Sequence, residues 1–495
     1  MLTPELLARL AELTDLDALG ALLGWDQQTM MPPDGAEARA DLMATLAVLA
    51  HERQTAPELG RLLDAATPAE EPETAIVRVA RRDHDRARRV PSTLAAEMEL
   101  AAARAQEPWA RARKTSDFAL FAPYLERNLE LRRRYADCFD GVDHPYDALL
   151  DVFEPGLTTV RVREVFAALR AGLVPLVAAI AAAPPAPVLP GPFAVEAQQQ
   201  LGLQIARAFG FDDDGWRMDG AVHPFAQSLS SRDIRVTARY DPRDLNGLFA
   251  VMHEMGHGLY ERQVDPALRR TTLGTGVSLG VHESQSRLWE NLVGRSEPFW
   301  RHWGPRLRAL CPDAVGSCSD RDLLRAINAV APSLIRVDAD EVTYSLHVIL
   351  RFELEVAMLE GTLAVADLPE AWSAATADLL GIAVPDDARG ALQDIHWAFG
   401  EFGYFPTYAI GNIVAAQLWD AMAAEIPDRD GQMAAGDYTA IRAWLGEHVH
   451  RPGRTVEPAD LLLRVTGSAL DPAPLLAQLT TKYSDLYGLE VAAVA

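Results

Sequence analysis

The pentapeptide His253-Glu254-Met255-Gly256-His257 constrains this chain more than any other stretch. Two histidines four residues apart on a helix rise by one turn and project from the same face, which is the spacing that two ligands of one zinc ion need. The glutamate between them then lies beside the metal, where its carboxylate can take a proton from a bound water. The pattern therefore predicts a helix that carries two metal ligands and a base.

The residues around the pentapeptide agree with this interpretation. At about 100° per residue, Glu254 and His257 fall within an arc of about 100° measured from His253. The apolar residues of the segment lie together on the opposite side of the helix: Leu248, Met252, Met255 and Leu259. One helix thus presents a chemical face and an apolar packing face. The alternative interpretation is a chance match of five residues on an ordinary helix.

A catalytic zinc site needs three protein ligands and one open position. The candidate for the third ligand is Glu283, at the start of a second predicted helix that runs to Val293. We predict that this helix presents Glu283 inward, toward the two histidines. His282 is an alternative ligand, although it points about 100° away from Glu283. A surface carboxylate favoured by the helix dipole is the remaining interpretation of Glu283.

The composition indicates a soluble and mostly helical protein. Alanine and leucine are abundant and β-branched runs are few, which favours helices. The 46 basic side chains against 70 acidic ones give a net charge of −24, which argues against nucleic acid or an anionic membrane as a partner. The 495 residues are enough for one large core or for two or three domains.

The cysteines and the N-terminus predict a cytoplasmic protein. Cys138, Cys311 and Cys318 are an odd number without CxxC spacing, so reduced thiols are a better interpretation than a disulfide framework. The N-terminal residues lack a basic segment followed by an apolar core, so no signal peptide is visible. The most apolar run, Leu173 to Ala183, is too short to span a bilayer and is more simply a buried helix.

Helical periodicity dominates the first part of the chain, and the proline-rich stretch from Pro184 to Pro192 is the best candidate for a linker. We predict a single domain in which residues 1–192 form a helical N-terminal portion and residues 193–495 form the catalytic portion. The clearest strand is residues 234–240, which alternate, are rich in β-branched side chains and end just before the metal-motif helix. This strand either offers an exposed edge to a peptide or belongs to a short hairpin that braces the helix.

Five stretches, taken in order along the chain, share the motifs of a known family. They are Asp233 to Thr237 (DxRxT), His253 to His257 (HExxH), His282 to Arg287 (HES-x-SR), Ile335 to Asp340 (IRxxAD) and Gly390 to Trp397 (GxxQDxHW). Gly403 to Tyr408 also matches a motif of this family, and Trp25 to Gln27 together with Met31-Pro32 matches one more weakly. On these motifs the chain resembles the carboxypeptidase Taq family of zinc metallocarboxypeptidases, and the likeness spans almost the whole chain.

The resemblance implies an almost all-helical, saddle-like molecule with a deep central groove, a zinc ion at the floor of the groove and a small β-element beside it. It also implies a homodimer that removes single residues from the C-termini of peptides with broad specificity, C-terminal proline being disfavoured. We therefore predict that His253, His257 and Glu283 hold one Zn²⁺, with Co²⁺ as a candidate substitute. Glu254 is predicted to be the general base.

The tetrahedral intermediate of peptide hydrolysis needs hydrogen-bond donors near its oxyanion. The candidates are His396, Tyr404 and Tyr408, in a stretch rich in aromatic residues and glycine. We predict catalytic roles for His396 and Tyr408 and a substrate-binding role for Tyr404. The alternative is that His396 and Trp397 only pack a helix.

An exopeptidase must also bind the free α-carboxylate of its substrate, and the planar fork of an arginine matches a carboxylate. Arg336 is the favoured residue for this role, and Arg235 is predicted to bind the peptide further along. The alternative for Arg336 is a structural ion pair with Asp338 or Asp340. The alternative for Arg235 is an ion pair with Asp233.

Two competing functions remain open at this point. A dipeptidyl carboxypeptidase or an endo-acting oligopeptidase on a related helical scaffold shares HExxH and a downstream glutamate. A peptide-binding protein that kept the fold and lost catalysis is the rival from another class. The intact ligand and base residues weigh against that second rival.

Overall fold

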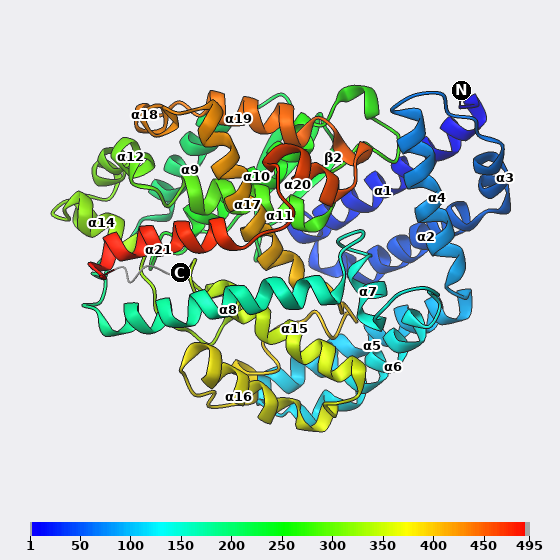
Figure 1. The fold of residues 1–495 in the computed structure, drawn as a ribbon, viewed down its shortest axis with the longest axis horizontal. Coiled ribbons are helices and arrows are strands. Elements are labelled where there is room, and N and C mark those ends of the chain that lie inside the picture. The colour runs from blue at the N-terminus through cyan, green and yellow to red at the C-terminus, as the bar shows by residue number, and fades with distance from the viewer. Residues whose placement is uncertain (1, 491–495) are drawn as a thin grey trace. The chain divides into compact units, whose positions relative to one another are not determined.

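The computed structural model describes residues 2–490, which form two units, each built from three separated segments of chain. The first unit comprises the chain up to Arg88, Pro187–Ile327 and Ala415–Ala469. The second comprises Arg89–Ala186, Asn328–Val414 and the chain from Leu470 onward. Helices hold 67% of the residues and strands 3%, so the predicted mostly helical fold with a small β-element is confirmed (Figure 1).

The predicted linker coincides with a point at which the chain passes from one unit to the other. The second unit's first segment ends at Ala186, and the first unit resumes at Pro187, inside the proline-rich stretch. The predicted portions 1–192 and 193–495 do not correspond to these units, because the first unit takes segments from both sides of residue 192. The division into a helical and a catalytic portion stays a prediction.

The first unit holds the small sheet and the helices around it. Its strands are β1 (Trp216–Gly220), β2 (Ala226–Ser230) and β3 (Asp233–Ala238). Its helical elements are α1 (Pro4–Thr29), η1 (Pro33–Gly35), α2 (Ala36–Thr55), α3 (Pro57–Ala65), α4 (Glu73–Arg89), α9 (Val195–Phe209), α10 (Asn246–Gln263), η3 (Pro266–Leu268), α11 (Leu279–Arg287), η4 (Leu288–Val293), α12 (Glu297–Leu310), α13 (Pro312–Val315), α14 (Asp320–Ile327), α18 (Arg429–Ala435), α19 (Thr439–Leu445), η8 (Gly446–His450), η9 (Gly453–Thr455) and α20 (Pro458–Thr466).

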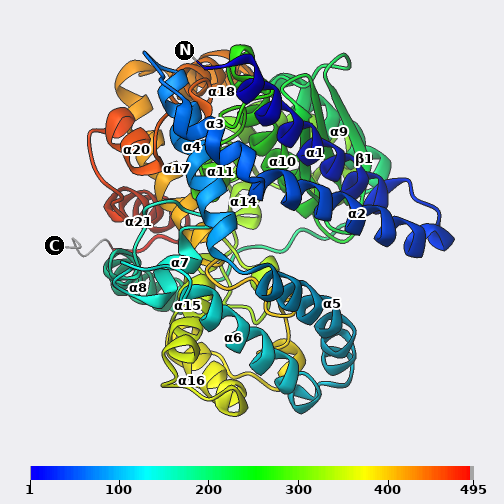
Figure 2. The same cartoon turned by 90° about the vertical axis from the view of Figure 1, so that its right-hand side faces the viewer.

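The second unit contains helices and no strand among its described residues. Its elements are α5 (Ser92–Thr115), η2 (Phe118–Leu120), α6 (Ala122–Ala136), α7 (Pro145–Leu150), α8 (Thr159–Ala182), η5 (Arg336–Asp338), α15 (Tyr344–Glu360), η6 (Val365–Asp367), α16 (Leu368–Leu380), η7 (Asp387–Arg389) and α21 (Ala473–Tyr487). One further helix, α17 (Pro406–Glu425), begins in the second unit and ends in the first. Figure 2 shows α5 and α6 side by side, which agrees with their direct packing.

The sheet has the strand order β1-β3-β2, with β1 parallel and β2 antiparallel to β3. The predicted strand is confirmed as β3, but it is the central strand, and both of its edges are paired. The interpretation that this strand offers an exposed edge is therefore wrong. The reason is that two shorter, more polar segments, β1 and β2, find their strand conformation by pairing with it. Since β3 packs against α10, the sheet braces the metal-motif helix.

Helix α10 is anchored by its apolar face and by one glycine. The predicted apolar face is confirmed, because its members are at most 1% exposed: Leu248, Met252, Met255 and Leu259. Gly258 lies on the sheet, where an added Cβ would be 2.4 Å from the Trp216 ring and 2.9 Å from the Ile234 side chain. A larger residue at 258 would thus lift α10 off the sheet.

A second glycine of α10 sets its distance from α11. A Cβ at Gly256 would lie 2.4 Å from the carbonyl oxygen of Gln285 and 2.6 Å from the Cα of Ser286. Both atoms belong to the backbone, which cannot rotate aside as a side chain can. Gly256 therefore permits the close approach of the helix that carries the two histidines to the helix that carries Glu283.

The second unit is built around α15, most of whose residues are buried. The ring of Phe352 on α15 meets Phe166 on α8 and Tyr146 on α7, with centroids 5.2 and 5.5 Å apart. By length and composition alone, α8 is the one helix of the described chain that could cross a membrane. Its buried apolar residues recur every three or four positions along one face, as is typical of a core helix.

Replacing Gly256 by alanine is expected to push α11 away from α10, because the new methyl group would overlap fixed backbone atoms. We expect Gly256→Ala to lower the free energy of unfolding by about 1–3 kcal/mol and to weaken metal binding. Gly24→Ala on α1 is the matched control, since nothing lies within 4 Å of the added methyl group. That control should leave stability unchanged or raise it by up to about 1 kcal/mol. Urea unfolding measures the stability of each variant, and a zinc titration measures its metal affinity. Equal stability and equal zinc affinity of Gly256→Ala and Gly24→Ala would contradict the prediction.

Candidate metal centre

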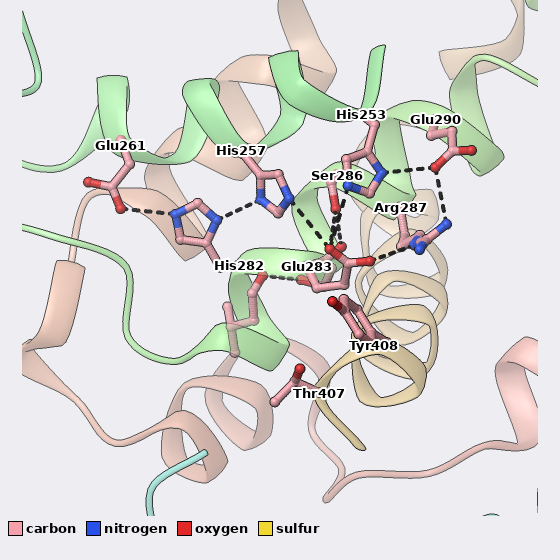
Figure 3. A network of polar contacts seen from close by, with 12 residues as sticks. His253, His257, Glu261, His282, Glu283, Ser286, Arg287, Glu290, Thr407 and Tyr408 are labelled. Atoms are coloured by element: carbon pink, nitrogen blue, oxygen red, sulfur yellow. Dashed lines mark hydrogen bonds and ion pairs between the residues drawn. The ribbon is translucent and has the colours of Figure 1, made fainter. Parts of the chain in front are cut away.

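Helices α10 and α11 bring His253, His257 and Glu283 to one point (Figure 3). The Nε2 atoms of His253 and His257 lie 3.6 and 3.4 Å from Oε2 of Glu283. One ligand atom from each of the three residues lies within 4.8 Å of the other two. Helix α11 starts at the N-cap Ser278, whose hydroxyl accepts from the Val281 amide, and this start places Glu283 in its second turn.

These residues fit a divalent metal ion of the zinc type. Bonds of about 2.0–2.1 Å in a tetrahedron separate neighbouring ligand atoms by roughly 3.3 Å, close to the observed 3.4 and 3.6 Å. Two imidazole nitrogens and one carboxylate oxygen are also a donor set that catalytic zinc sites use, with the fourth position open. The three side chains are therefore arranged as ligands of one ion.

The ligand side chains are held by partners on their far sides. Nδ1 of His253 lies 2.9 Å from Oε2 of Glu290, which fixes the ring with Nε2 directed at the site. Arg287 donates from Nε to Oε1 of Glu283 at 2.7 Å and from Nη1 to Glu290 at 3.2 Å. Ser286 donates its hydroxyl to Oε2 of Glu283 at 3.0 Å. The centre is thus pre-organised by the protein itself.

Burial and nearby charges set opposite protonation preferences at the two glutamates of the centre. Burial would raise the pKa of Glu283, but the Arg287 guanidinium and the two imidazoles outweigh it and hold that pKa well below its ordinary value. Glu254 is 6% exposed, and burial raises its pKa to about 7. Glu283 is therefore ionised, whereas Glu254 can exchange a proton near neutral pH.

His282 is not a ligand of this centre. Its Nδ1 lies 2.7 Å from Nδ1 of His257, and its Nε2 lies 3.0 Å from Oε1 of Glu261. The alternative assignment of His282 as third ligand is therefore wrong, because both of its nitrogens are directed elsewhere. Glu261 and Glu290 are functional candidates that the sequence analysis missed, although their positions four residues after His257 and seven after Glu283 place them on the same helix faces.

Arg235 lies in the first unit, on β3. Its guanidinium makes two hydrogen bonds of 2.9 Å to Asp233, the partner that the sequence analysis offered as the alternative. Its Cζ lies 4.2 Å from the centroid of the Trp25 ring, and Arg217 contacts the same ring at 4.5 Å. The arginines hold Trp25 of α1 by cation–π contacts, and the substrate-binding role of Arg235 stays a prediction.

The second unit brings together the other predicted site residues. Nε2 of His396 lies 3.1 Å from the hydroxyl of Tyr408. The ring of Tyr404 is 5.5 Å from His396 and 5.2 Å from Tyr408, measured between centroids. Cζ of Arg336 lies 4.8 Å from the centroid of the Tyr408 ring. Burial lowers the pKa of His396 to about 4, so this imidazole is neutral at neutral pH.

Arg336 is buried and ion-paired with a residue that its sequence neighbourhood did not suggest. Its Nε and Nη2 donate to Oδ1 of Asp394 at 3.0 and 2.8 Å, and its Nη1 donates to the hydroxyl of Tyr344 at 3.2 Å. Arg351 donates to the other oxygen of Asp394 at 2.7 Å. One carboxylate therefore serves two buried guanidiniums, and neither Asp338 nor Asp340 pairs with Arg336.

A buried glutamate holds the loop that carries His396 and Tyr404. Glu355 of α15 is fully buried and accepts hydrogen bonds from the Tyr146 hydroxyl at 2.5 Å, the Trp397 indole at 2.7 Å and the Gly403 amide at 3.1 Å. Burial raises its pKa to about 7. Trp397 therefore packs and hydrogen-bonds within the core. This is the packing role that the alternative interpretation gave it.

The arrangement on α10 and α11 is that of a metallopeptidase, and comparisons with known proteins give the family. The model of the carboxypeptidase Taq (M32) metallopeptidase family matches residues 5–483. Thermostable carboxypeptidase 1 of Thermus thermophilus is 42% identical over 98% of this chain and 100% of that protein, and carboxypeptidase 1 of Bacillus subtilis is 39% identical over 94% and 95%. The crystal structure of an M32 carboxypeptidase from Deinococcus radiodurans superposes with a TM-score of 0.96 at 42% identity, covering 98% of this chain and 99% of that one.

The chain belongs to the carboxypeptidase Taq (M32) family of metallocarboxypeptidases, so the resemblance read from its motifs is confirmed. Membership makes it a peptide hydrolase that depends on a divalent metal and acts on peptides. The residues that match this requirement are His253, His257 and Glu283.

The buried position of Glu355 predicts a pH-dependent stability. Since its pKa in the folded state is about 7 against an ordinary 4.5, the folded protein binds this proton more tightly than the unfolded chain does. The stabilisation is complete below about pH 4.5 and is lost as the pH rises through about 7; the loss is on the order of 3 kcal/mol. Glu355→Gln should remove this loss, so its melting temperature should fall less than that of the wild type between pH 5 and pH 8. Parallel pH profiles of the two proteins would contradict the assignment.

Proposed function

We propose that this chain is a zinc-dependent carboxypeptidase that releases single amino acids from the C-termini of peptides with broad specificity. The observation that carries the proposal is the convergence of two imidazole nitrogens and one carboxylate oxygen on one point beside a buried glutamate. The relatives from Thermus thermophilus and Bacillus subtilis, which are named carboxypeptidases, support the exopeptidase assignment. The donor set favours zinc, with Co²⁺ as a substitute.

His253, His257 and Glu283 would hold the ion, and a zinc ion bound there supplies a Lewis acid that lowers the pKa of water and polarises a carbonyl group. Glu254 takes the proton from the attacking water and delivers it to the leaving amine. Burial raises the pKa of this carboxyl, which strengthens the carboxylate as a proton acceptor. Glu290 and Arg287 keep the ligands oriented during the reaction.

The remaining site residues keep their predicted roles in this proposal. His396 and Tyr408 donate hydrogen bonds to the oxyanion, and Tyr404 binds the substrate. Arg336 binds the α-carboxylate, and Arg235 binds the peptide further along. The shared Asp394 supports the role of Arg336, because two guanidiniums around one carboxylate leave positive charge for a second anion.

We also propose a cytoplasmic homodimer without nucleic-acid or membrane partners. The net charge of −24 supports the absence of polyanionic partners, and three unpaired cysteines suit a reducing compartment. The homodimer follows from the family resemblance.

Hydrolysis of a pentapeptide tests the proposed reaction. The wild type with zinc is expected to release single amino acids in sequence from the C-terminus, whereas dipeptides or internal fragments would identify the rival activities. Glu254→Gln should retain one zinc per chain and lose at least about 100-fold in kcat, because the general base is removed while the ligands remain. The zinc content is the control, and near wild-type turnover in this variant would overturn the role of Glu254. No cleavage by the zinc-loaded wild type would indicate a silent peptide-binding homologue.

A comparison of peptide acids with peptide amides tests Arg336. The wild type should strongly prefer the free acid, and Arg336→Ala should lose about 30-fold or more in kcat/KM on acids, in line with 2–5 kcal/mol for an unpaired buried charge. Its rate on amides should change little. The thermal midpoint of the variant separates a lost contact from a lost fold. An unchanged ratio of acid to amide rates in a folded variant would exclude the carboxylate role.

A further inference from the structure

A second chain of polar contacts leads away from the metal centre through His257. Nδ1 of His257 lies 2.7 Å from Nδ1 of His282, and Nε2 of His282 lies 3.0 Å from Oε1 of Glu261 (Figure 3). The same Glu261 oxygen accepts from the Thr275 hydroxyl at 2.8 Å and from the Gly276 amide at 3.0 Å. Three donors therefore fix the outer end of the chain.

The direction of each hydrogen bond in this chain follows from the role of His257. Because Nε2 of His257 faces Glu283 and the metal position, that atom must offer a lone pair, and the ring proton lies on Nδ1. This N–H donates to Nδ1 of His282, which must then accept. The proton of His282 therefore lies on Nε2 and is donated to Glu261. Any other tautomer of His282 would set two N–H groups against each other across 2.7 Å.

The surroundings of His282 hold its ring in this orientation. Its centroid lies 4.8 Å from that of His257 and 5.2 Å from that of Tyr260. A Cβ at Gly276 would come within 2.8 Å of Cδ2 of His282, so the loop backbone presses on the other edge of the ring. The ring is thus packed as well as hydrogen-bonded.

The two histidine ligands are supported in different ways. His253 meets its carboxylate, Glu290, directly, and that carboxylate also contacts Arg287 and Arg295. On its Nδ1 side, His257 reaches a carboxylate, Glu261, through the intervening imidazole of His282. The outer end of this longer chain lines a cavity of about 240 Å³, together with residues of β2, so water can replace a removed side chain there.

We propose that His282 and Glu261 are positioning residues for the metal: they fix the tautomer and the ring orientation of His257 and thereby raise the metal affinity of the centre. The proposal rests on the proposed metal-dependent function only in requiring that an ion binds at His257. It predicts that the two residues act as one unit, because Glu261 reaches His257 solely through His282.

Metal affinity of the purified protein tests this without an activity assay. Zn²⁺ dissociation constants are measured by competition with a chelator, and the visible absorption of the Co²⁺-loaded protein reports the ligand geometry. His282→Leu and Glu261→Gln are expected to weaken Zn²⁺ binding by about 10–100-fold and to alter the Co²⁺ spectrum. His282→Gln should recover much of the affinity, because its amide can accept at one atom and donate at the other.

A double variant and a distant control make the test specific. His282→Leu/Glu261→Gln should bind Zn²⁺ about as weakly as His282→Leu alone, since the second change acts through a link that is already broken. His84→Leu removes another buried imidazole of the first unit, which contacts the Gln54 carbonyl, and should leave the dissociation constant unchanged.

Two results would overturn the proposal: a Zn²⁺ dissociation constant within about 2-fold of wild type in folded His282→Leu or Glu261→Gln, or fully additive losses in the double variant. If His282→Leu does not fold, Glu261→Gln and His282→Gln still decide the question. A wild type that binds zinc tightly but releases no single amino acids would overturn the proposed function and leave this test intact.

Discussion

The close approach of α10 and α11 is the constraint on which the candidate centre depends. The two histidines lie on successive turns of one helix, but the third candidate ligand, Glu283, comes from the other, and it reaches them only because Gly256 lets the two backbones approach closely. Gly258, on another side of α10, sits against Trp216 and the sheet. The helix is therefore held between two rigid neighbours. Side chains on packed helices are positioned more precisely than side chains on loops, and the candidate ligands all lie on such helices.

Local spacing predicted much of this arrangement. The helical period relates residues three and four apart, so the polar and apolar faces of α10 and the inward direction of Glu283 follow from the sequence alone. The same rule correctly set His282 apart from the ligand face. The same rule also indicates Glu261, one turn beyond His257, and Glu290, two turns beyond Glu283, which continue the faces of those residues.

Contacts between elements could not be predicted in this way. The partner of Arg336 is Asp394, 58 positions away, while the nearer Asp340 is engaged with the amides and hydroxyl at the start of α15. Sequence proximity suggested the wrong acid because an ion pair depends on which loops meet. The predicted short hairpin is present as the antiparallel pair β2–β3, but the sequence does not mark β1 or β2 by themselves, since short polar segments become strands only by pairing with β3.

Environment explains why the two buried glutamates Glu254 and Glu283 differ in protonation. Glu283 lies against the Arg287 guanidinium and two imidazoles, so it stays ionised and could bind a metal ion without first losing a proton. Glu254 lies on the same chemical face but is dominated by burial, which brings its pKa to about 7. A carboxylate poised there can take up a proton and release it again at little cost in free energy. The difference in protonation between the two glutamates therefore depends on the burial of Glu254 and on the Arg287 guanidinium and two imidazoles beside Glu283, and the HExxH pattern alone does not contain it.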